Sequence, residues 1–369
     1  MIKKGNRESL IGICSEIDEV ILYGAGKRIE LFERIFHDTI VLDKVSVILD
    51  SDCNKRGNKI NINGKKIIIK EPKEYSICQE KKYIIIITCM SFGEIVTYLQ
   101  SSNMYKDIDT YIMSQIYASD EKKWMMEMYV PKDKRISKEQ LIPKKIHYCW
   151  FGENPIPDKY KKWMESWHKY CPDYEIIEWN ESNYDITKNK YMYQAYKQKK
   201  WAFVPDYARL DIIYSEGGIY LDTDVELVKN LDDFLYQDGY AGFESEKYVA
   251  FGLGFGARKG LPIIRELRDQ YNDMEFPEAN VSNNLVASPV IQTHFLVNKG
   301  LKQDGSYQTV NGLTIYPERV LCGKSMVSGK ILIGDETKSV HHYDGSWLDK
   351  EHKKRIDDSI AELNHYFIL

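Results

Sequence analysis

The chain lacks the features that mark a secreted, membrane-spanning or nucleic-acid-binding protein. Its longest apolar run, Tyr83 to Ile87, is far shorter than the ~20 residues that a membrane-spanning helix requires. The polar residues 1–7 are followed by no apolar segment of signal-peptide length. Lysine plus arginine (51) nearly balance aspartate plus glutamate (55), so no basic face for nucleic acid is expected. We therefore expect a cytoplasmic protein that binds no nucleic acid.

Cysteine gives no sign of a zinc site or a disulfide framework. The seven cysteines are scattered and odd in number, and no two of them form a Cys-x-x-Cys pair. Free thiols in a reducing compartment are the simpler interpretation. At 369 residues, the chain is long enough for two domains with separate cores.

The first third of the chain predicts a small Rossmann-like α/β domain, which we place at residues 1–118. Its first clear strand runs into a Gly-Ala-Gly turn and a helical apolar pattern, and the next strand ends in Asp50. The third glycine of the dinucleotide fingerprint is missing, because Ile29 occupies its position. The order of elements resembles the N-terminal domains of bacterial sugar O-acyltransferases, which bind nucleotide-sugars. Two interpretations stay open: Gly24, Gly26 and Asp50 hold a nucleotide-sugar, or the domain only docks and stabilises.

A second domain is predicted after a charged linker. Residues 119–141 are rich in charge and interrupted by proline, and we place the linker there. Residues 142–369 then begin with a strand, an amphipathic helix and a second strand, which is a β-α-β order. Further on, a helix is opened by Pro205 and stopped by the pair Gly217-Gly218. The fold class predicted for both domains is α/β.

An Asp-X-Asp triplet is the most informative motif of the chain. Asp222 and Asp224 follow the short apolar run 219–221, which comes directly after the glycine pair. In a chain this rich in acids, an isolated triplet usually marks a solvated turn. Here the acids fall where a buried strand leaves its sheet, which is where open α/β sheets bind ligands. Mg²⁺ and Mn²⁺ prefer oxygen ligands and are shared between carboxylates and substrate phosphates, so the motif predicts a metal site facing a diphosphate.

Asp206 and Arg209 lie three residues apart on the helix that Pro205 opens, so they can share one face. One interpretation is an ordinary intrahelical ion pair, worth a few tenths of a kcal/mol. The functional interpretation gives Arg209 a phosphate or sugar oxygen to contact, and gives Asp206 a hydroxyl from which to accept a hydrogen bond.

Four blocks stand out between residues 142 and 347. They are Ile-His-Tyr-Cys-Trp-Phe-Gly (146–152), Trp-Ala-Phe-Val-Pro-Asp-Tyr-Ala-Arg-Leu-Asp (201–211), Gly-Gly-Ile-Tyr-Leu-Asp-Thr-Asp-Val (217–225) and His-His-Tyr-Asp-Gly-Ser-Trp (341–347). Together these blocks resemble glycosyltransferase family 32, the DXD-sugar transferases of bacterial capsule and surface-polysaccharide synthesis. The resemblance implies a GT-A-type fold, a nucleotide-sugar donor and Mn²⁺ or Mg²⁺, with a UDP-sugar favoured over a GDP-sugar. It also implies hexosyl transfer, with retention of configuration, onto a glycan or a lipid-linked oligosaccharide.

The resemblance also assigns roles to residues at matching positions. They are Trp150 as a platform for the donor base, Asp206 and Arg209 as donor-sugar contacts, Tyr220 as a pocket wall, and Asp222 and Asp224 as ribose and metal ligands. His342 stands five residues before the closing tryptophan and would complete the metal shell, although its neighbour His341 leaves that choice open. Ser346 and Trp347 would close over the phosphates.

Two rival functions use the same acids. A metal-dependent hydrolase or phosphotransferase would need a water-activating base or a second metal cluster, and the sequence offers no clear one. A non-catalytic protein that binds nucleotide-sugars as a sensor would bind the donor without turnover. The end of the chain predicts an amphipathic helix, with its apolar face at Ile356, Ile360, Leu363 and Phe367. This helix either packs on the second domain or contacts a membrane that carries a lipid-linked acceptor, at its inner face.

Overall fold

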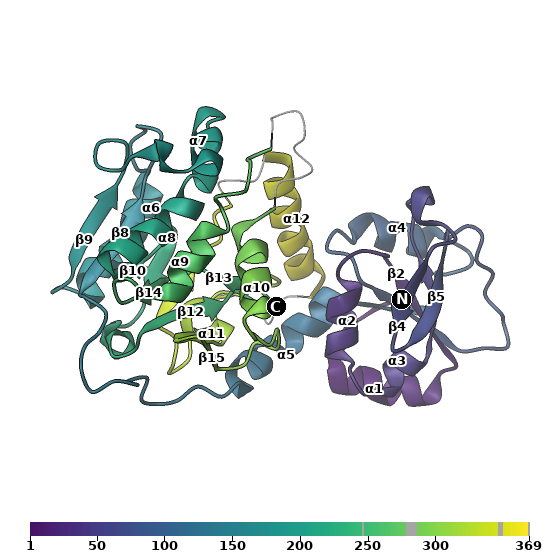
Figure 1. Ribbon diagram of the computed structural model, residues 1–369. Coiled ribbons are helices and arrows are strands. Elements are labelled where there is room, and N and C mark those ends of the chain that lie inside the picture. The colour runs from purple at the N-terminus through teal and green to yellow at the C-terminus, as the bar shows by residue number, and fades with distance from the viewer. Residues whose placement is uncertain (246, 278–285, 346–349, 368–369) are drawn as a thin grey trace. The chain divides into compact units, whose positions relative to one another are not determined.

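The computed structural model describes residues 1–245, 247–277, 286–345 and 350–367, and the chain forms two compact units (Figure 1). Unit 1 consists of residues 1–124, 327–329 and 349–369, and unit 2 consists of residues 125–326 and 330–348. Each unit combines a β-sheet with helices, so the predicted α/β class is confirmed.

The sheet of unit 1 is parallel except at one edge, where β4 and β5 are antiparallel. In order across the sheet, its strands are β1 (Ile2–Lys3), β7 (Asp109–Ile112), β6 (Tyr83–Ile87), β2 (Glu19–Tyr23), β3 (Val45–Leu49), β5 (Lys65–Lys70) and β4 (Lys59–Ile62). Its helices include α1 (Arg7–Glu16), α2 (Ile29–Ile35), α3 (Ile40–Asp43) and α4 (Gly93–Ser101). On β6, Ile84 and Ile86 pack into one core while Ile85 and Ile87 pack into the other. Parallel strands covered on both faces need such continuous apolar runs.

The C-terminal helix α12 (Lys350–Phe367) belongs to unit 1, which corrects the expectation that it forms part of the second domain. Leu363 and Phe367 are buried in the same apolar cluster as Phe92. The Lys4 ammonium also donates to the carbonyl of Phe367 at 2.6 Å. The helical repeat of apolar residues predicted the burial of Leu363 and Phe367, but Ile356 on the same predicted face is 37% exposed. The repeat also carried no information about which core receives that face.

Unit 2 is built on a larger mixed sheet and a separate two-stranded ribbon. In order across the sheet, its strands are β15 (Gln308–Val310), β16 (Leu313–Tyr316), β12 (Gly239–Phe243), β14 (Phe255–Ala257), β10 (Gly218–Tyr220), β8 (Lys145–Cys149) and β9 (Glu175–Trp179), with β13 (Val249–Ala250) paired to β12. The ribbon pairs β11 (Val225–Leu227) with β17 (Ser339–His341). The helices include α6 (Asp158–Tyr170), α7 (Lys190–Lys197), α8 (Pro205–Glu216), α9 (Pro262–Asp269), α10 (Ser288–Asn298) and α11 (Glu318–Leu321).

Helix α8 carries two of the predicted site residues into the core of unit 2. Pro205 occupies its first turn, as predicted, and Gly217 ends it with a positive φ of 68°. The residues of α8 from Pro205 to Ile213 are buried, because the helix packs against α9 on one side and against β8 and β10 on the other. Polar residues on this helix are therefore held in a low-dielectric environment.

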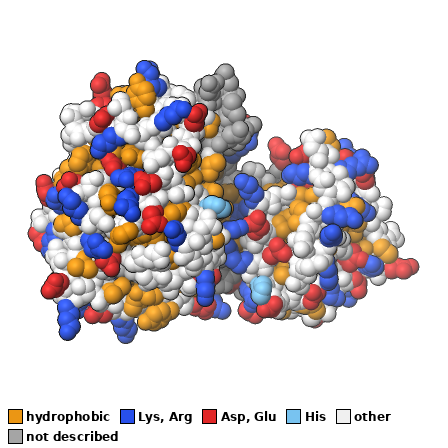
Figure 2. Space-filling model, in the orientation of Figure 1, with side chains coloured by type: hydrophobic (Ala, Val, Ile, Leu, Met, Phe, Trp, Pro, Cys, Tyr) orange, Lys and Arg blue, Asp and Glu red, His pale blue; other side chains and the backbone are white. Residues whose placement is uncertain are grey.

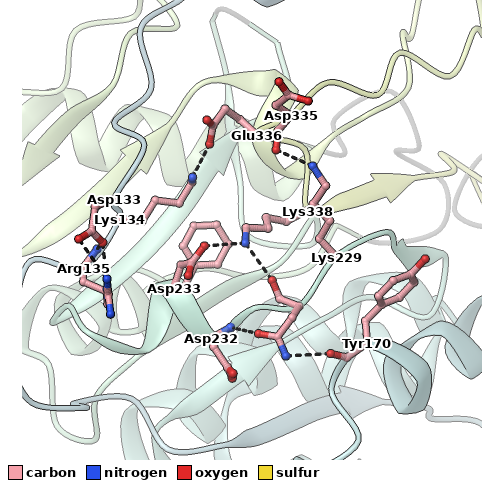
Figure 3. Close-up of polar contacts among 12 residues, drawn as sticks. Asp133, Lys134, Arg135, Tyr170, Lys229, Asp232, Asp233, Asp335, Glu336 and Lys338 are labelled. Carbon is pink, nitrogen blue, oxygen red and sulfur yellow. Dashed lines mark hydrogen bonds and ion pairs between the residues drawn. The ribbon is translucent and has the colours of Figure 1, made fainter.

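Residues 119–141, which we predict to form a linker, are helical in their first part. That part belongs to helix α5 (Met113–Glu127), and the segment that follows is fastened to unit 2. Lys134, which is only 3% exposed, forms an ion pair with Glu336 (Figure 3). The backbone N–H of Ile136 donates to the carbonyl of Tyr236 at 2.9 Å. These contacts hold the segment against unit 2 before β8 begins.

The surface shows no dominant sign of charge on the face drawn in Figure 2, where lysines and arginines are interspersed with aspartates and glutamates. Over the whole sequence the net charge is −4. Within the described ranges, every helix is too short or too polar to span a lipid bilayer.

Candidate active site

The two acids of the Asp-X-Asp motif lie directly after β10, at the carboxyl end of that strand. The backbone N–H of Asp222 donates to the carbonyl of Gly252 at 3.1 Å, and the N–H of Val225 donates to the carbonyl of Asp222 at 3.0 Å. This turn leads from the main sheet into β11, so Asp224 stands at the junction between the sheet and the ribbon. The local apolar run and the glycine pair before it account for this placement.

Asp222, Asp224 and His341 converge in space. The pairing of β11 with β17 places His341 opposite Val225, and the Nε2 atom of His341 lies 3.2 Å from Oδ1 of Asp224. One ligand atom from each of the three side chains lies within 4.8 Å of the others. Two carboxylates and an imidazole fit a divalent cation such as Mn²⁺, and the remaining coordination positions can take water or phosphate oxygens.

His342, the residue expected as the metal ligand, faces away from this cluster. Its Nε2 atom lies 2.8 Å from Oε2 of Glu226, and its ring stacks on Trp163 at 4.1 Å with an interplanar angle of 10°. The expectation is corrected in favour of His341, because successive side chains on an extended segment point to opposite sides. The register of β17 on β11 decides which of the two histidines meets Asp224.

Arg209 links the helix α8 to the Asp-X-Asp turn. Its Nη2 atom lies 3.1 Å from Oδ1 of Asp206, and its Nη1 atom lies 3.4 Å from Oδ2 of Asp222. The Tyr220 hydroxyl donates to Oδ1 of Asp222 at 2.9 Å, and the guanidinium lies over the Tyr220 ring at 5.1 Å. The pair Asp206–Arg209 is therefore a buried bridge to the motif, rather than an isolated surface ion pair.

The carboxyl groups of the site differ in their proton affinity. Burial alone would raise the pKa of Asp224, but His341 and the backbone N–H of Asp344 outweigh it and hold that pKa below its usual range. Burial raises the pKa of Asp222, although Arg209 opposes this. Burial likewise raises the pKa of Asp206 to about 6. Asp224 is thus the acid most firmly held in the charged form that a metal requires.

Residues 342–345, which lie beside Asp224, are hydrogen-bonded to helix α6 and to the Asp-X-Asp motif. The backbone N–H of Asp344 donates to Oδ2 of Asp224 at 2.9 Å. The Asp344 carboxylate accepts from Lys159 and Tyr160 on α6. The Tyr160 ring packs edge to face against Trp150, with 5.7 Å between the ring centroids. Trp150, the expected platform for the donor base, is thus connected to Asp224 through Tyr160 and Asp344. The expected phosphate contacts Ser346 and Trp347 lie outside the described residues.

Gly252 leaves no room for a side chain beside the acids. A Cβ atom at this position would lie 2.1 Å from Oδ2 of Asp222 and 3.0 Å from Nη1 of Arg209. We expect Gly252→Ala to displace the Asp222 carboxylate and to lower turnover by about a hundredfold, since a misplacement of about 1 Å is enough for such a loss. Turnover and the thermal midpoint should be measured together. Gly26→Ala is the matched control, because nothing lies within 4 Å of its added Cβ. Equal losses in both variants would contradict the steric argument.

In unit 1, the Asp50 carboxylate is already bonded to neighbouring groups of the protein. Its carboxylate accepts from the backbone N–H of Ala25 at 2.7 Å and of Asp52 at 2.9 Å, and it pairs with Lys55 at 3.0 Å. A Cβ at Gly24, whose φ is +114°, would meet the sulfur of Cys89 at 2.2 Å. These contacts favour the structural interpretation of the glycine turn. A cavity of about 380 Å³ nevertheless lies at the carboxyl ends of β2, β3 and β6, and α12 contributes to its wall.

Sequence reasoning missed three features of the site. Gly252 was not predicted as part of the site, although it lies against Asp222 and Arg209. Tyr343, with a positive φ of 53°, is strained for an aromatic residue and lies with its ring 4.3 Å from that of His341. Glu244 follows β12 near His341 and gave no signal in the sequence. The positions of Gly252 and Glu244 depend on contacts between segments far apart in the chain.

The site thus combines a partly buried acid pair at the end of a strand with an arginine behind it and an imidazole beside it. Residues 157–241 match the family described as "Glycosyltransferase sugar-binding region containing DXD motif". That stretch contains Asp206, Arg209 and both acids of the triplet. These site residues therefore lie inside the region that matches this glycosyltransferase family.

Several known proteins resemble this part of the chain. Inositol phosphoceramide mannosyltransferase 3 of Schizosaccharomyces pombe is 30% identical over 130 residues, which is 34% of this chain and 36% of the relative. An uncharacterized glycosyltransferase of Acanthamoeba polyphaga mimivirus is 36% identical over 101 residues, 26% of this chain and 40% of the relative. Among solved structures, the PaToxG glycosyltransferase is 20% identical, with a TM-score of 0.35 over 50% of this chain and 76% of that one. The chain thus spans well under half the length of these two curated relatives.

Proposed function

We propose that unit 2 transfers a hexose from a nucleotide-sugar, in a reaction that depends on Mn²⁺ or Mg²⁺, to a hydroxyl of a glycan or a lipid-linked oligosaccharide. The observation that carries the proposal is the convergence of Asp222, Asp224 and His341 within 4.8 Å beside the buried Arg209. We further propose retention of configuration, a UDP-sugar rather than a GDP-sugar as donor, and a role in surface-polysaccharide synthesis in the cytoplasm. The resemblance to family 32 supports these finer points.

In this proposal, different side chains of unit 2 bind different parts of the donor. A divalent cation bound by Asp222, Asp224 and His341 would neutralise charge on the departing diphosphate. Arg209 holds the Asp222 carboxylate in place from behind and presents a fixed positive charge near the sugar. Asp206 accepts a hydrogen bond from a sugar hydroxyl, and Trp150 provides a flat surface on which the donor base stacks.

The test is a panel of UDP- and GDP-sugars incubated with the protein and Mn²⁺, with release of the nucleotide diphosphate as the readout. Slow, metal-dependent hydrolysis of one donor, accelerated by an acceptor glycan, supports the transferase. Hydrolysis that no acceptor accelerates would favour a hydrolase, and binding without nucleotide release would favour a sensor. The panel should include mannosyl donors, and the acceptors an inositol-bearing lipid, because the names of the Schizosaccharomyces relatives mention both groups.

The two histidines give a sharp test of the metal ligands. We expect His341→Ala to raise the Mn²⁺ concentration for half-maximal donor hydrolysis at least tenfold, because one ligand atom is lost. His342→Ala should leave the Mn²⁺ dependence unchanged and lower the free energy of unfolding by about 1 kcal/mol, through loss of its ring stacking on Trp163. Mn²⁺ titrations of both variants make the comparison. A shift in the His342 variant alone would restore the original assignment.

A further inference from the structure

The turn that follows β13 is shaped around the Asp-X-Asp motif. Gly252 lies against Asp222 with no room for a Cβ atom, and its carbonyl accepts from the backbone N–H of Asp222 at 3.1 Å. Two residues further on, Gly254 has a φ of +128°, and a Cβ atom there would lie 2.9 Å from Cδ2 of Leu221. The turn therefore contacts both the end of the apolar run and the first acid of the motif. A shift of the turn would displace the Asp222 carboxylate.

Two side chains of helix α10 bond to the backbone of β13 and of this turn. The Thr293 hydroxyl accepts from the N–H of Val249 at 2.8 Å. The Oε1 atom of Gln292 accepts from the N–H of Phe251 at 3.1 Å. Phe251 lies beyond the last residue of β13 that pairs with β12, and directly before Gly252. Gln292 therefore restrains the turn at a residue that strand pairing no longer holds.

Gln292 makes this contact at a cost in stability. Its side chain is fully buried, and its Nε2 atom has no hydrogen-bond partner among the described residues. A buried N–H group without a partner costs free energy. Thr293 carries no such cost, because its hydroxyl both accepts from the N–H of Val249 and donates to the carbonyl of that residue at 3.5 Å. Stability alone would therefore favour a side chain at position 292 without the second polar atom.

We propose that Gln292 is a positioning residue of the metal site. Its amide oxygen fixes the backbone of Phe251, and with it the turn that carries Gly252. The turn keeps the Asp222 carboxylate at the distance from the other two ligand side chains that a shared cation requires. Gln292 itself contacts neither the cation nor the donor. The proposal rests on the metal-dependent function proposed above, because the position of this carboxylate matters most if it binds a metal.

The experiment measures three quantities in the full chain: the Mn²⁺ dependence of donor hydrolysis, Mn²⁺ binding by calorimetry in the presence of UDP, and the thermal midpoint. We expect Gln292→Met to raise the Kd for Mn²⁺, and the Mn²⁺ concentration for half-maximal hydrolysis, about tenfold, as loss of a group that orients a metal ligand does. Its thermal midpoint should stay within about 2 °C of the wild type, because the variant loses one hydrogen bond but also removes the unpaired N–H group. Gln292→Asn, which keeps an amide that is one methylene shorter, should shift metal binding less.

Thr293→Val is the matched control, since it removes the same kind of bond from the same helix, at Val249 rather than at Phe251. We expect its thermal midpoint to fall by at least about 2 °C, because a buried N–H group loses its partner. Its Mn²⁺ dependence should stay within about twofold of the wild type. If Gln292→Met also loses thermal stability and leaves metal binding unchanged, Gln292 has only a structural role and the proposal is wrong.

A double variant tests whether Gln292 acts through Gly252. Because Gly252→Ala already displaces the Asp222 carboxylate, adding Gln292→Met should lower turnover no more than about twofold further. A further tenfold loss would reveal an independent route and overturn the proposal.

The calorimetry separates this proposal from the function on which it rests. Wild-type protein that binds Mn²⁺ but hydrolyses no donor would overturn the transferase function alone, and the Kd values of the variants would still decide the role of Gln292. Wild-type protein that binds no Mn²⁺ in the presence of UDP would overturn both.

Discussion

Replacing Asp224 by Asn is expected to abolish donor turnover, with a loss of at least about a hundredfold at saturating Mn²⁺. Asp224 holds His341 at 3.2 Å and accepts from the backbone N–H of Asp344 at 2.9 Å, so it joins the motif to the ribbon and to the loop that follows. The amide retains the size of the side chain but loses the charge that attracts a cation. Nucleotide release measured against Mn²⁺ concentration tests this directly.

The control for this substitution is Asp158→Asn on the first turn of α6. The Asp158 side chain is 99% exposed, and it pairs only with Lys161 on the same helix in the described structure. Its replacement should leave turnover within about twofold, since exposed ion pairs contribute little. If Asp224→Asn retains wild-type turnover at every Mn²⁺ concentration, the proposed metal site is wrong.

Replacing Arg209 by Met is expected to cost both activity and stability. The guanidinium contacts Asp206 and Asp222 from within the core, and its removal leaves two carboxylates without their counter-charge. Breaking such a buried pair typically costs 3–5 kcal/mol, and turnover should fall at least about a thousandfold because the donor also loses a fixed charge. Chemical unfolding, monitored by tryptophan fluorescence, measures the loss of stability. The fluorescence reports mainly on unit 2, where most of the tryptophans lie.

A double variant separates the two effects of Arg209. Asp206→Asn combined with Arg209→Met removes one of the unpaired charges, so part of the stability should return while turnover stays low.

The pH dependence of stability gives a second check on the role of Arg209. The pKa of Asp206 is raised from 3.8 to about 6 on folding, so the folded state binds more protons than the unfolded state between these values. Stability from this group therefore falls as pH rises through that window. In Arg209→Met the pKa of Asp206 rises further, because the opposing positive charge is gone. The loss of stability relative to the wild type should therefore be smaller at pH 5 than at pH 8.

Much of the local architecture around the site was predictable, because its signals are local. Pro205 at the start of α8 and Gly217 at its end fix the helix through their own backbone preferences. The apolar run before Asp222 forms the buried strand β10, as its composition indicated. The spacing of Asp206 and Arg209 was enough to place them on one face, but it did not show that this face is buried.

The remaining parts of the site depend on pairing between distant segments. His341 and His342 are identical in side chain and adjacent in sequence, and only the register of β17 on β11 distinguishes them. Gly252 takes its position from the turn after β13, where Asp222 meets it from another part of the chain. Such contacts between distant segments leave no local pattern in a single sequence.

The assignment of α12 to unit 1 has a consequence for synthesis of the chain. Unit 2 is an insertion between the β-sheet of unit 1 and the helix that completes one of its cores. On the ribosome, the sheet emerges first and all of unit 2 must follow before Leu363 and Phe367 become available to fill their places beside Phe92. Unit 1 therefore reaches its final packing only after translation of unit 2, and until then its apolar surface at Phe92 needs protection from other chains.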